Sequence, residues 1–250
     1  MPPFEKNIAA PRGKRGTVGA VLLFFVFLAL PVRALAQWSL SAGVGKVYAA
    51  GRELRLVRPP FQTDLRIRGV RYRDRSFEFP LYYNVRLFHR LSGGKVEIGF
   101  GFTHAKVYAD PDRVVQTAGV WKGLPVHAPK RFGDVISAFS ISHGLNLLAL
   151  SAQRNFLRNR FGALWFGAGF GLVLSHTEVT LSGRHEEHYE LDGPLFRLGL
   201  EVRVPACSSV ALSFRLSGAR IWLRHLDVPD GSIGTELVTW HIEAGPVFRF

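Results

Sequence analysis

Hydrophobic and polar residues alternate along most of the chain that follows Trp38. From Phe166 to Leu174, for example, every second residue is apolar and most of the residues between are glycine. Successive side chains of a β-strand point to opposite faces of a sheet, so this alternation predicts strands with one apolar and one polar face. The alternating segments cover about residues 38–48, 78–91, 96–107, 134–151, 161–176, 189–204, 210–224 and 235–250.

The connections between these segments alternate in length. The short ones are 92–95, 152–160 and 205–209, and the long ones are 49–77, 108–133, 177–188 and 225–234. Short turns at one end and long loops at the other are typical of an outer-membrane β-barrel, in which the long loops are extracellular. We therefore predict an all-β fold, an eight-stranded antiparallel transmembrane β-barrel with a polar lumen and long extracellular loops.

The polar faces of the predicted strands carry charged side chains, which distinguishes a barrel from a soluble β-sandwich. The dry core between two sheets would not tolerate these groups, whereas a narrow barrel can pair opposite charges inside its lumen. We interpret them as a structural filling of the lumen and not as a catalytic set. They are Asn84, Arg86, Glu97, Arg197, Glu201, Arg203, Arg215, His241, Glu243 and Arg249.

The N-terminus has the pattern of a secretory signal peptide. Basic residues precede an apolar run from Val18 to Leu30, and the sequence "ALA" follows at Ala34–Ala36. The run is about 13 residues long, whereas a membrane-spanning helix needs roughly 20. We predict a signal peptide over 1–36 and a mature barrel over 37–250, exported to the outer membrane of a Gram-negative bacterium.

The charge of the chain identifies its expected partners. Lys and Arg total 32 against 19 Asp and Glu, an excess that favours a polyanion. An exported protein rarely meets nucleic acid, so we expect no nucleic acid partner and instead contacts with outer-membrane lipids, above all lipid A or lipopolysaccharide. The single Cys207 excludes an internal disulfide framework, and we expect a monomer.

Three consecutive predicted strands carry a histidine just beyond their apolar faces, toward the long-loop end. These residues are His104, His143 and His176, and Glu178 follows the last of them. Neighbouring strands lie about 4.8 Å apart, so the four side chains are a candidate catalytic group at the level of lipid headgroups. Two histidines and a carboxylate suit iron, which makes these residues candidate ligands of a divalent metal ion. Simple solvation of headgroups is the alternative explanation.

Arginine dominates the first long connection, 49–77. Arg52, Arg55, Arg66 and Arg68 belong to a set of eight arginines without one lysine, and guanidinium groups suit phosphate. Together with Lys106, which shares the apolar face of its strand with His104, we predict that these four arginines bind the substrate. Ordinary surface solvation explains part of the same pattern.

Four stretches resemble the bacterial lipid A oxidase family. They are "FTHAKVYAD" at Phe102–Asp110, "ISHGLNLLAL" at Ile141–Leu150, "GAGFGLVLSHTEVTLSG" at Gly167–Gly183 and "YELDGP" at Tyr189–Pro194. The resemblance implies an outer-membrane barrel that oxidises the proximal glucosamine of lipid A to 2-aminogluconate with dioxygen as co-substrate. No glycine-rich nucleotide-binding motif stands between a strand and a helix, so we expect no nucleotide cofactor.

Two other classes of function stay open. Lipid A deacylases are also small barrels, but they need a serine paired with a histidine and an acid. Ser142 and His143 are adjacent in sequence, as are Ser175 and His176, so each pair is expected on opposite strand faces, which argues against direct pairing. A non-enzymatic small outer-membrane barrel is the third class.

Overall fold

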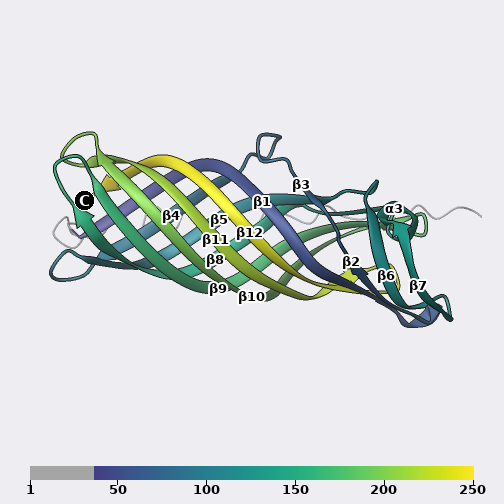
Figure 1. Cartoon of the computed structure of the whole chain (residues 1–250). Helices are drawn as coiled ribbons and strands as arrows, with labels where there is room; N and C mark the ends of the chain where they lie inside the picture. The colour runs from purple at the N-terminus through teal and green to yellow at the C-terminus, as the bar shows by residue number, and fades with distance from the viewer. Residues whose placement is uncertain (1–36) are drawn as a thin grey trace, which may run out of the picture. The chain divides into compact units, whose positions relative to one another are not determined.

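Antiparallel β-strands make up almost all of the computed structural model, which describes residues 37–250. Eight strands follow one another along the hydrogen-bonded path β1-β4-β5-β8-β9-β10-β11-β12, and β12 also pairs with β1, so the path returns to its start. Figure 1 shows these strands inclined around a common axis. Their bounds are β1 Trp38–Arg58, β4 Tyr83–Arg90, β5 Val96–Ala109, β8 Ala138–Arg158, β9 Ala163–Leu181, β10 Arg184–Pro205, β11 Val210–Val228 and β12 Gly231–Arg249.

Each of the eight predicted segments overlaps one of these strands, but most strands are longer than predicted. The connections 91–95, 159–162 and 206–209 lie at one end, which we call the short-turn end. At the opposite end, the hairpin end, β9 and β10 continue to a turn at Ser182 and Gly183, both with positive φ, as in tight hairpins. The prediction of long loops at 177–188 and 225–234 is therefore wrong, because β9 pairs with β10, and β11 with β12, up to tight turns. The predicted signal peptide lies outside the described residues.

The two remaining long connections contain structure of their own. Residues 49–77 hold η1 (Pro59–Phe61), β2 (Thr63–Arg68) and β3 (Tyr72–Asp74), while 108–133 hold the hairpin of β6 (Val114–Trp121) and β7 (Leu124–Arg131). A short helix, α3 (Phe132–Val135), leads into β8. β2 joins β1 to β6, so the sheet continues past the ring of eight at the hairpin end (Figure 1).

The interior changes character along the axis. Toward the short-turn end it holds charged groups, as the sequence predicts, but toward the hairpin end it is an apolar core, so the prediction of a polar lumen is wrong for that half. A bulge in β1 between Gly51 and Leu54 contributes to this change, because Val44 and Tyr48 face outward before it and Leu54 and Leu56 face inward after it. The core includes Val47, Leu54, Leu56, Leu65, Ile67, Val107, Phe132, Ile136, Phe139, Ile141, Val179, Leu181, Ile221, Leu223, Leu226, Ile233 and Leu237.

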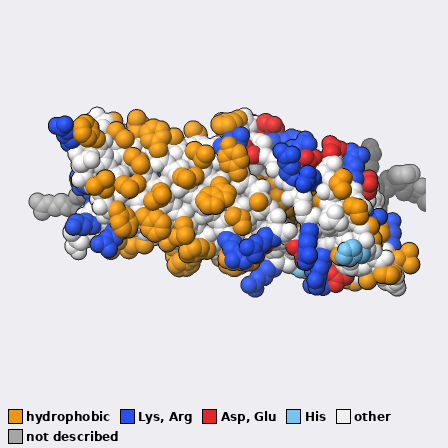
Figure 2. Space-filling model, in the orientation of Figure 1, with side chains coloured by type: hydrophobic (Ala, Val, Ile, Leu, Met, Phe, Trp, Pro, Cys, Tyr) orange, Lys and Arg blue, Asp and Glu red, His pale blue; other side chains and the backbone are white. Residues whose placement is uncertain are grey.

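The outer surface changes in the opposite sense. Large apolar side chains cover the wall from the short-turn end to about the middle of the strands, and charged side chains cover the hairpin end (Figure 2). We call the first region the apolar belt; its exposed members include Val85, Phe100, Leu150, Phe170, Leu172, Phe196, Leu198, Phe214, Leu216, Trp240 and Ile242. Among residues 37–250, no helix is long and apolar enough to cross a membrane.

Candidate functional site

A β-bulge on β8 sets the geometry of the candidate site. The pairing of β8 with β9 shifts between Ile141 and Leu145, and Gly144 has a φ of 150°. A Cβ atom at Gly144 would lie 2.2 Å from the side-chain nitrogen of Asn146, so the bulge depends on glycine. The extra residues disturb the regular alternation of faces and turn Ser142 and His143 toward the same neighbour.

That neighbour is Glu178 on β9. The Nδ1 atom of His143 lies 2.6 Å from Oε1 of Glu178 and 3.1 Å from the Ser142 hydroxyl oxygen, and Ser142 also donates a hydrogen bond to Glu178. The expectation that adjacent Ser142 and His143 cannot interact is therefore wrong, because strict alternation fails at a bulge.

His176 completes the group from two residues earlier on β9. Its Nδ1 atom lies 3.9 Å from Oε1 of Glu178, and its Nε2 atom lies 3.6 Å from a carboxylate oxygen of Glu187. The ring stacks on Tyr189 of β10 at 4.0 Å between centroids and meets the His143 ring edge-on at 5.0 Å. We call His143, His176 and Glu178 the His-His-Glu cluster.

The cluster lies outside the ring of strands, directly beyond the apolar belt. On β9 the outward residues Phe170 and Leu172 are exposed, and His176 and Glu178 follow on the same face toward the hairpin end. His176 and Glu178 therefore lie just past the apolar face of β9, as the sequence predicts.

Protonation in the cluster is set by burial and by the neighbouring charges. Burial lowers the pKa of His176 below its ordinary value, and the nearby His143 lowers it further, which outweighs the attraction of Glu178 and Glu187. Burial alone would raise the pKa of Glu178, but hydrogen bonds from Ser142 and His143 outweigh that effect and lower it. Near neutral pH the site therefore combines a carboxylate with a neutral His176 imidazole.

These groups fit a divalent transition metal ion. One ligand atom from each of His143, His176 and Glu178 can be chosen so that all lie within 4.8 Å of one another. The Nδ1 atom of His176 is buried and has no hydrogen-bond partner among residues 37–250, which leaves a lone pair for a ligand. Two imidazoles and one carboxylate are a donor set that suits iron.

The same geometry is unfavourable for a serine hydrolase. In a Ser-His-acid relay the acid bonds one imidazole nitrogen and the serine bonds the other. Here Ser142 and Glu178 both contact Nδ1 of His143, and the serine proton points to the carboxylate. In this arrangement His143 cannot act as the general base for Ser142 through one ring nitrogen while Glu178 orients the ring through the other.

His104 lies on the next strand, β5, outside the His-His-Glu cluster. Its Nδ1 atom lies 2.8 Å from the amide oxygen of Asn146, and its ring stacks on Tyr83 at 5.1 Å. The side chain is 5% exposed, and Nε2 is buried without a hydrogen-bond partner in the described chain. Because an amide oxygen only accepts, Nδ1 carries the proton and Nε2 carries a lone pair. The structure thus brings three of the four predicted ligands together and places His104 beside them.

Each predicted substrate-binding cation has a partner within the protein. Lys106 is buried and donates from Nζ to the backbone oxygen of Glu78 at 2.8 Å. The arginines lie on β1 and β2, which pair with neither β8 nor β9. The contacts are Arg52 with Glu236 at 3.4 Å, Arg55 with Asp64 at 2.6 Å, Arg66 with Glu53 at 4.0 Å and Arg68 with Glu53 at 2.7 Å. These carboxylates occupy directions that a lipid phosphate would otherwise take.

Sequence reasoning missed several residues of the site. Tyr189 and Glu187 enter it because the register of β9 with β10 sets them opposite His176 and Glu178. Tyr108 lies opposite Ser140, which contacts Glu178 at 3.5 Å. Only a known strand register could have identified these partners, because their separation in sequence carries no signal.

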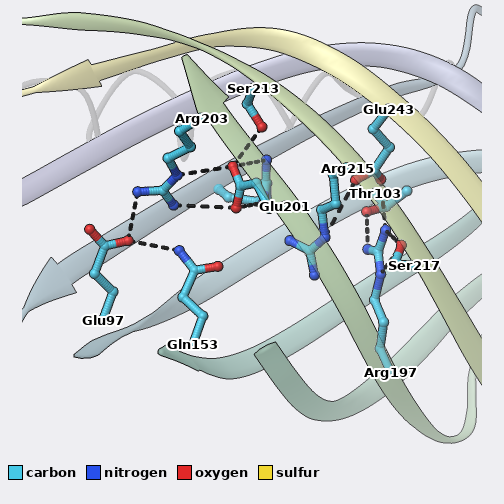
Figure 3. A network of polar contacts seen from close by, with 11 residues as sticks. Glu97, Thr103, Gln153, Arg197, Glu201, Arg203, Ser213, Arg215, Ser217 and Glu243 are labelled. Atoms are coloured by element: carbon cyan, nitrogen blue, oxygen red, sulfur yellow. Dashed lines mark hydrogen bonds and ion pairs between the residues drawn. The ribbon is translucent and has the colours of Figure 1, made fainter. Parts of the chain in front are cut away.

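The charged interior forms a separate network (Figure 3). Glu201 accepts hydrogen bonds from Arg86, Arg203 and Ser213, and a second centre joins Glu243 to Arg197 at 2.7 Å. Arg203 extends the first centre to Glu97, which also accepts from Gln153. The interpretation of these groups as a structural filling agrees with this dense pairing of opposite charges.

The comparisons with known proteins match the chain to solved structures at low sequence identity. No protein-family model and no curated protein sequence matches the chain. Neisserial surface protein A matches with a TM-score of 0.47 at 12% identity, over 86% of this chain and 97% of that one. The outer membrane protease OmpT from Escherichia coli matches at 0.48 and 8%, over 85% and 96%. The outer membrane protein OprG from Pseudomonas aeruginosa matches at 0.41 and 8%, over 85% and 95%. Two of these neighbours are named as outer-membrane proteins, and one of those two is a protease.

Proposed function

We propose that the chain is an eight-stranded β-barrel of the Gram-negative outer membrane and that it modifies lipid A at the His-His-Glu cluster. The closed path of strand pairing and the outward belt of large apolar side chains support the barrel, because a closed sheet leaves no unpaired backbone groups in hydrocarbon. The charged interior fits the same proposal, since in a barrel the side chains opposite the belt line the lumen.

The observation that carries the enzymatic part is the place of the cluster. His143, His176 and Glu178 lie on the outer wall immediately beyond the apolar belt. A lipid whose acyl chains pack on the belt would hold its headgroup sugars at this height. The lowered pKa values keep His176 neutral and Glu178 ionised side by side. Clusters of groups with shifted pKa values are characteristic of functional sites.

The reaction that we propose is oxidation of the proximal glucosamine to 2-aminogluconate with dioxygen, following the resemblance to lipid A oxidases. Conversion of a glucosamine to an aminogluconate is a two-electron oxidation of its anomeric carbon: the C–H bond and the hydroxyl O–H bond break to give a lactone, dioxygen takes up the two electrons and two protons and leaves as hydrogen peroxide, and water then opens the lactone. Neutral His176 would contribute its free Nδ1 lone pair as a ligand of the metal ion, which a protonated ring could not do. A divalent metal ion, when bound by His143, His176 and Glu178, would supply the dioxygen chemistry. Tyr189 fixes the orientation of the His176 ring by stacking on it.

Mass spectrometry of lipid A from cells with and without the protein tests this function. Oxidation adds one oxygen to lipid A, deacylation removes an acyl chain, and a non-enzymatic barrel leaves the spectrum unchanged. The decisive variant is His176→Ala, with His225→Ala as the matched control, because His225 is exposed on β11 and bonded to no residue of the cluster. An oxidised product with the control and none with His176→Ala is the expected result.

Deacylation has one observation in its favour, the contact between Ser142 and His143. Ser142→Ala separates the two reactions. A deacylase would lose its activity with this variant, whereas an oxidase would keep most of it, because Glu178 retains its contact with His143.

A further inference from the structure

The connection between β3 and β4 exposes an unusual amount of apolar surface. Phe77, Phe79 and Leu81 are 72%, 94% and 49% exposed. They alternate with Glu78 and Pro80, and we call residues 77–81 the FEFPL loop after their sequence. In Figure 1 the connection between β3 and β4 projects sideways from the wall of strands. Three large apolar side chains on one short projection are costly in water.

The FEFPL loop is fixed at both ends. On its N-terminal side, Ser76 accepts a hydrogen bond from the backbone nitrogen of Val47 on β1 at 3.2 Å. On its C-terminal side, the Tyr82 hydroxyl reaches the interior and donates to Glu243 at 2.5 Å. The Tyr82 nitrogen also donates to the Ser76 oxygen at 2.8 Å, which closes the base of the loop. The outward direction of the loop is therefore built into the fold.

The base of the loop holds cations that are paired within the protein. Lys106 donates to the backbone oxygen of Glu78 at 2.8 Å, and the guanidinium of Arg75 lies 4.4 Å from the centre of the Tyr108 ring. Arg75 also pairs with Glu78 at 3.4 Å, and Lys46 on β1 lies 3.9 Å from a carboxylate oxygen of Asp74. These pairs neutralise the base, so the apolar tips are the part of the loop that is left to meet a membrane.

The loop also connects the apolar belt to the candidate site. Tyr83, the first residue of β4, follows the loop directly and packs on Phe102 at 5.7 Å and on His104 at 5.1 Å. Tyr108, which Arg75 covers, belongs to the strand that pairs with β8, where Ser142 and His143 lie. The base of the loop therefore borders β5, the strand that pairs with the one carrying Ser142 and His143.

We propose that the FEFPL loop inserts between the acyl chains of the outer leaflet and holds the lipid whose headgroup reaches the His-His-Glu cluster. This inference rests on the proposed function for the identity of the site, but the insertion itself requires only a lipid surface. Acyl chains are the occupant that we assign, because Phe77 lines one surface groove together with the belt residues Leu216 and Ile242, so the exposed side chains of the loop continue the apolar belt. A second copy of the chain or another protein would be the competing occupant.

A spin label at position 79 tests the insertion without any turnover. The exposed Cys207 is replaced by serine, Phe79→Cys is labelled with a nitroxide, and the refolded mature chain is placed in liposomes of phosphatidylcholine and lipopolysaccharide. Phe170→Cys marks the apolar belt and Lys122→Cys marks the turn between β6 and β7. We expect the label at 79 to collide with oxygen more than with a water-soluble nickel complex, as at position 170. A profile like that of position 122, or shielding from both reagents by a protein contact, would overturn the proposal.

The effect on lipid use is tested separately. The double variant Phe77→Ala and Phe79→Ala should raise the mole fraction of lipid A needed for half-maximal conversion by about tenfold, with the rate at saturation unchanged. The matched double variant Val114→Ala and Leu124→Ala removes exposed apolar side chains from the β6–β7 hairpin and should change neither quantity. Unchanged half-saturation in the loop variant would refute lipid holding. Absence of conversion by the unmodified protein would count against the proposed function alone, since the spin-label result stands without it.

Discussion

The Nδ1 atom of His143 and the Oε1 atom of Glu178 lie 2.6 Å apart, although the residues come from different strands and 35 positions separate them in sequence. The bulge at Ser142–Gly144 makes this contact by presenting His143 toward β9. Glu178 thereby becomes the common partner of Ser142, His143 and His176. Its carboxylate is the group on which the geometry of the site depends.

The first prediction follows from this central role. Glu178→Gln keeps the size of the side chain but removes the charge that the two histidines and Ser142 share, so lipid A conversion should fall by roughly 10²- to 10⁴-fold, as for loss of a proton-transfer group. Stability should change by less than about 1 kcal/mol because the side chain lies on the outer wall. Mass spectra of the product measure the loss of activity. The temperature at which the heated protein changes its migration on gel electrophoresis measures the change in stability. Glu186→Gln, on the neighbouring strand β10 and paired with Arg184, is the control.

The second prediction concerns metal binding. Protein refolded with ferrous iron under anaerobic conditions should retain about one metal ion per chain after desalting, because two imidazoles and a carboxylate converge. His143→Ala and His176→Ala should each retain much less, while His225→Ala should match the unmodified protein. Metal content by mass spectrometry measures this directly. Equal retention by all four proteins would exclude the cluster as the metal site.

The third prediction is a pH dependence. Because burial and His143 lower the pKa of His176, its imidazole should stay neutral until the pH falls below its ordinary value of 6.5. The lowered pKa of Glu178 keeps that group ionised until the pH falls below 4.5. As the pH falls below 6.5, His176 takes up a proton and no longer offers a lone pair. The stability contributed by ionised Glu178 is present above pH 4.5 and is lost as the pH falls below it. Conversion should therefore be level above pH 6.5 and decline on the acid side, with a midpoint under 6.5. A midpoint above 6.5 in the pH-rate profile would show that the His176 pKa is raised.

The alternation of apolar and polar residues predicted the eight strands of the ring because each strand can be recognised from its own residues. Each of the eight segments carries its own two-faced pattern, and no knowledge of pairing is needed to read it. The same approach failed where a bulge shifts the faces. Nothing in the sequence around Gly51 or Gly144 distinguishes a bulge from an ordinary strand glycine, yet the first accompanies the turn of Leu54 into the core and the second brings Ser142 to Glu178.

The positions of the candidate residues were predicted better than their surroundings. The order of His176 and Glu178 beyond the belt follows from strand parity alone. The burial of His104 and Lys106 could not be predicted from strand parity. Tyr83 on the preceding strand covers His104, and Glu78 in the preceding loop covers Lys106. Likewise, the carboxylates that pair with Arg55 and Arg68 lie across a strand pair whose register the sequence does not state.

The fourth prediction concerns the contribution of His104 to stability. His104 is buried, bonds Asn146 and stacks on Tyr83, so His104→Ala should lower the free energy of unfolding by about 1–3 kcal/mol, the range for loss of a buried hydrogen-bond partner. His185→Ala, at the exposed tip of the β9–β10 hairpin, should change it by less than about 0.5 kcal/mol. Urea unfolding in liposomes compares the two. Equal stability of both variants would contradict the buried environment of His104.

The last prediction separates the interior network from the candidate site. Glu201 is buried and accepts hydrogen bonds from Arg86, Arg203 and Ser213, so Glu201→Leu would leave the buried Arg86 without a carboxylate and Arg203 with Glu97 alone. Breaking such a pair from one side typically costs 3–5 kcal/mol, whereas Glu53→Leu, which disturbs only exposed pairs with Arg66 and Arg68, should cost less than about 1 kcal/mol. The fraction of Glu201→Leu that still folds should convert lipid A at the unmodified rate, because the hydrogen-bond partners of Glu201 within residues 37–250 lie outside the His-His-Glu cluster. A folded Glu201→Leu protein that has lost its activity would instead place the chemistry in the interior.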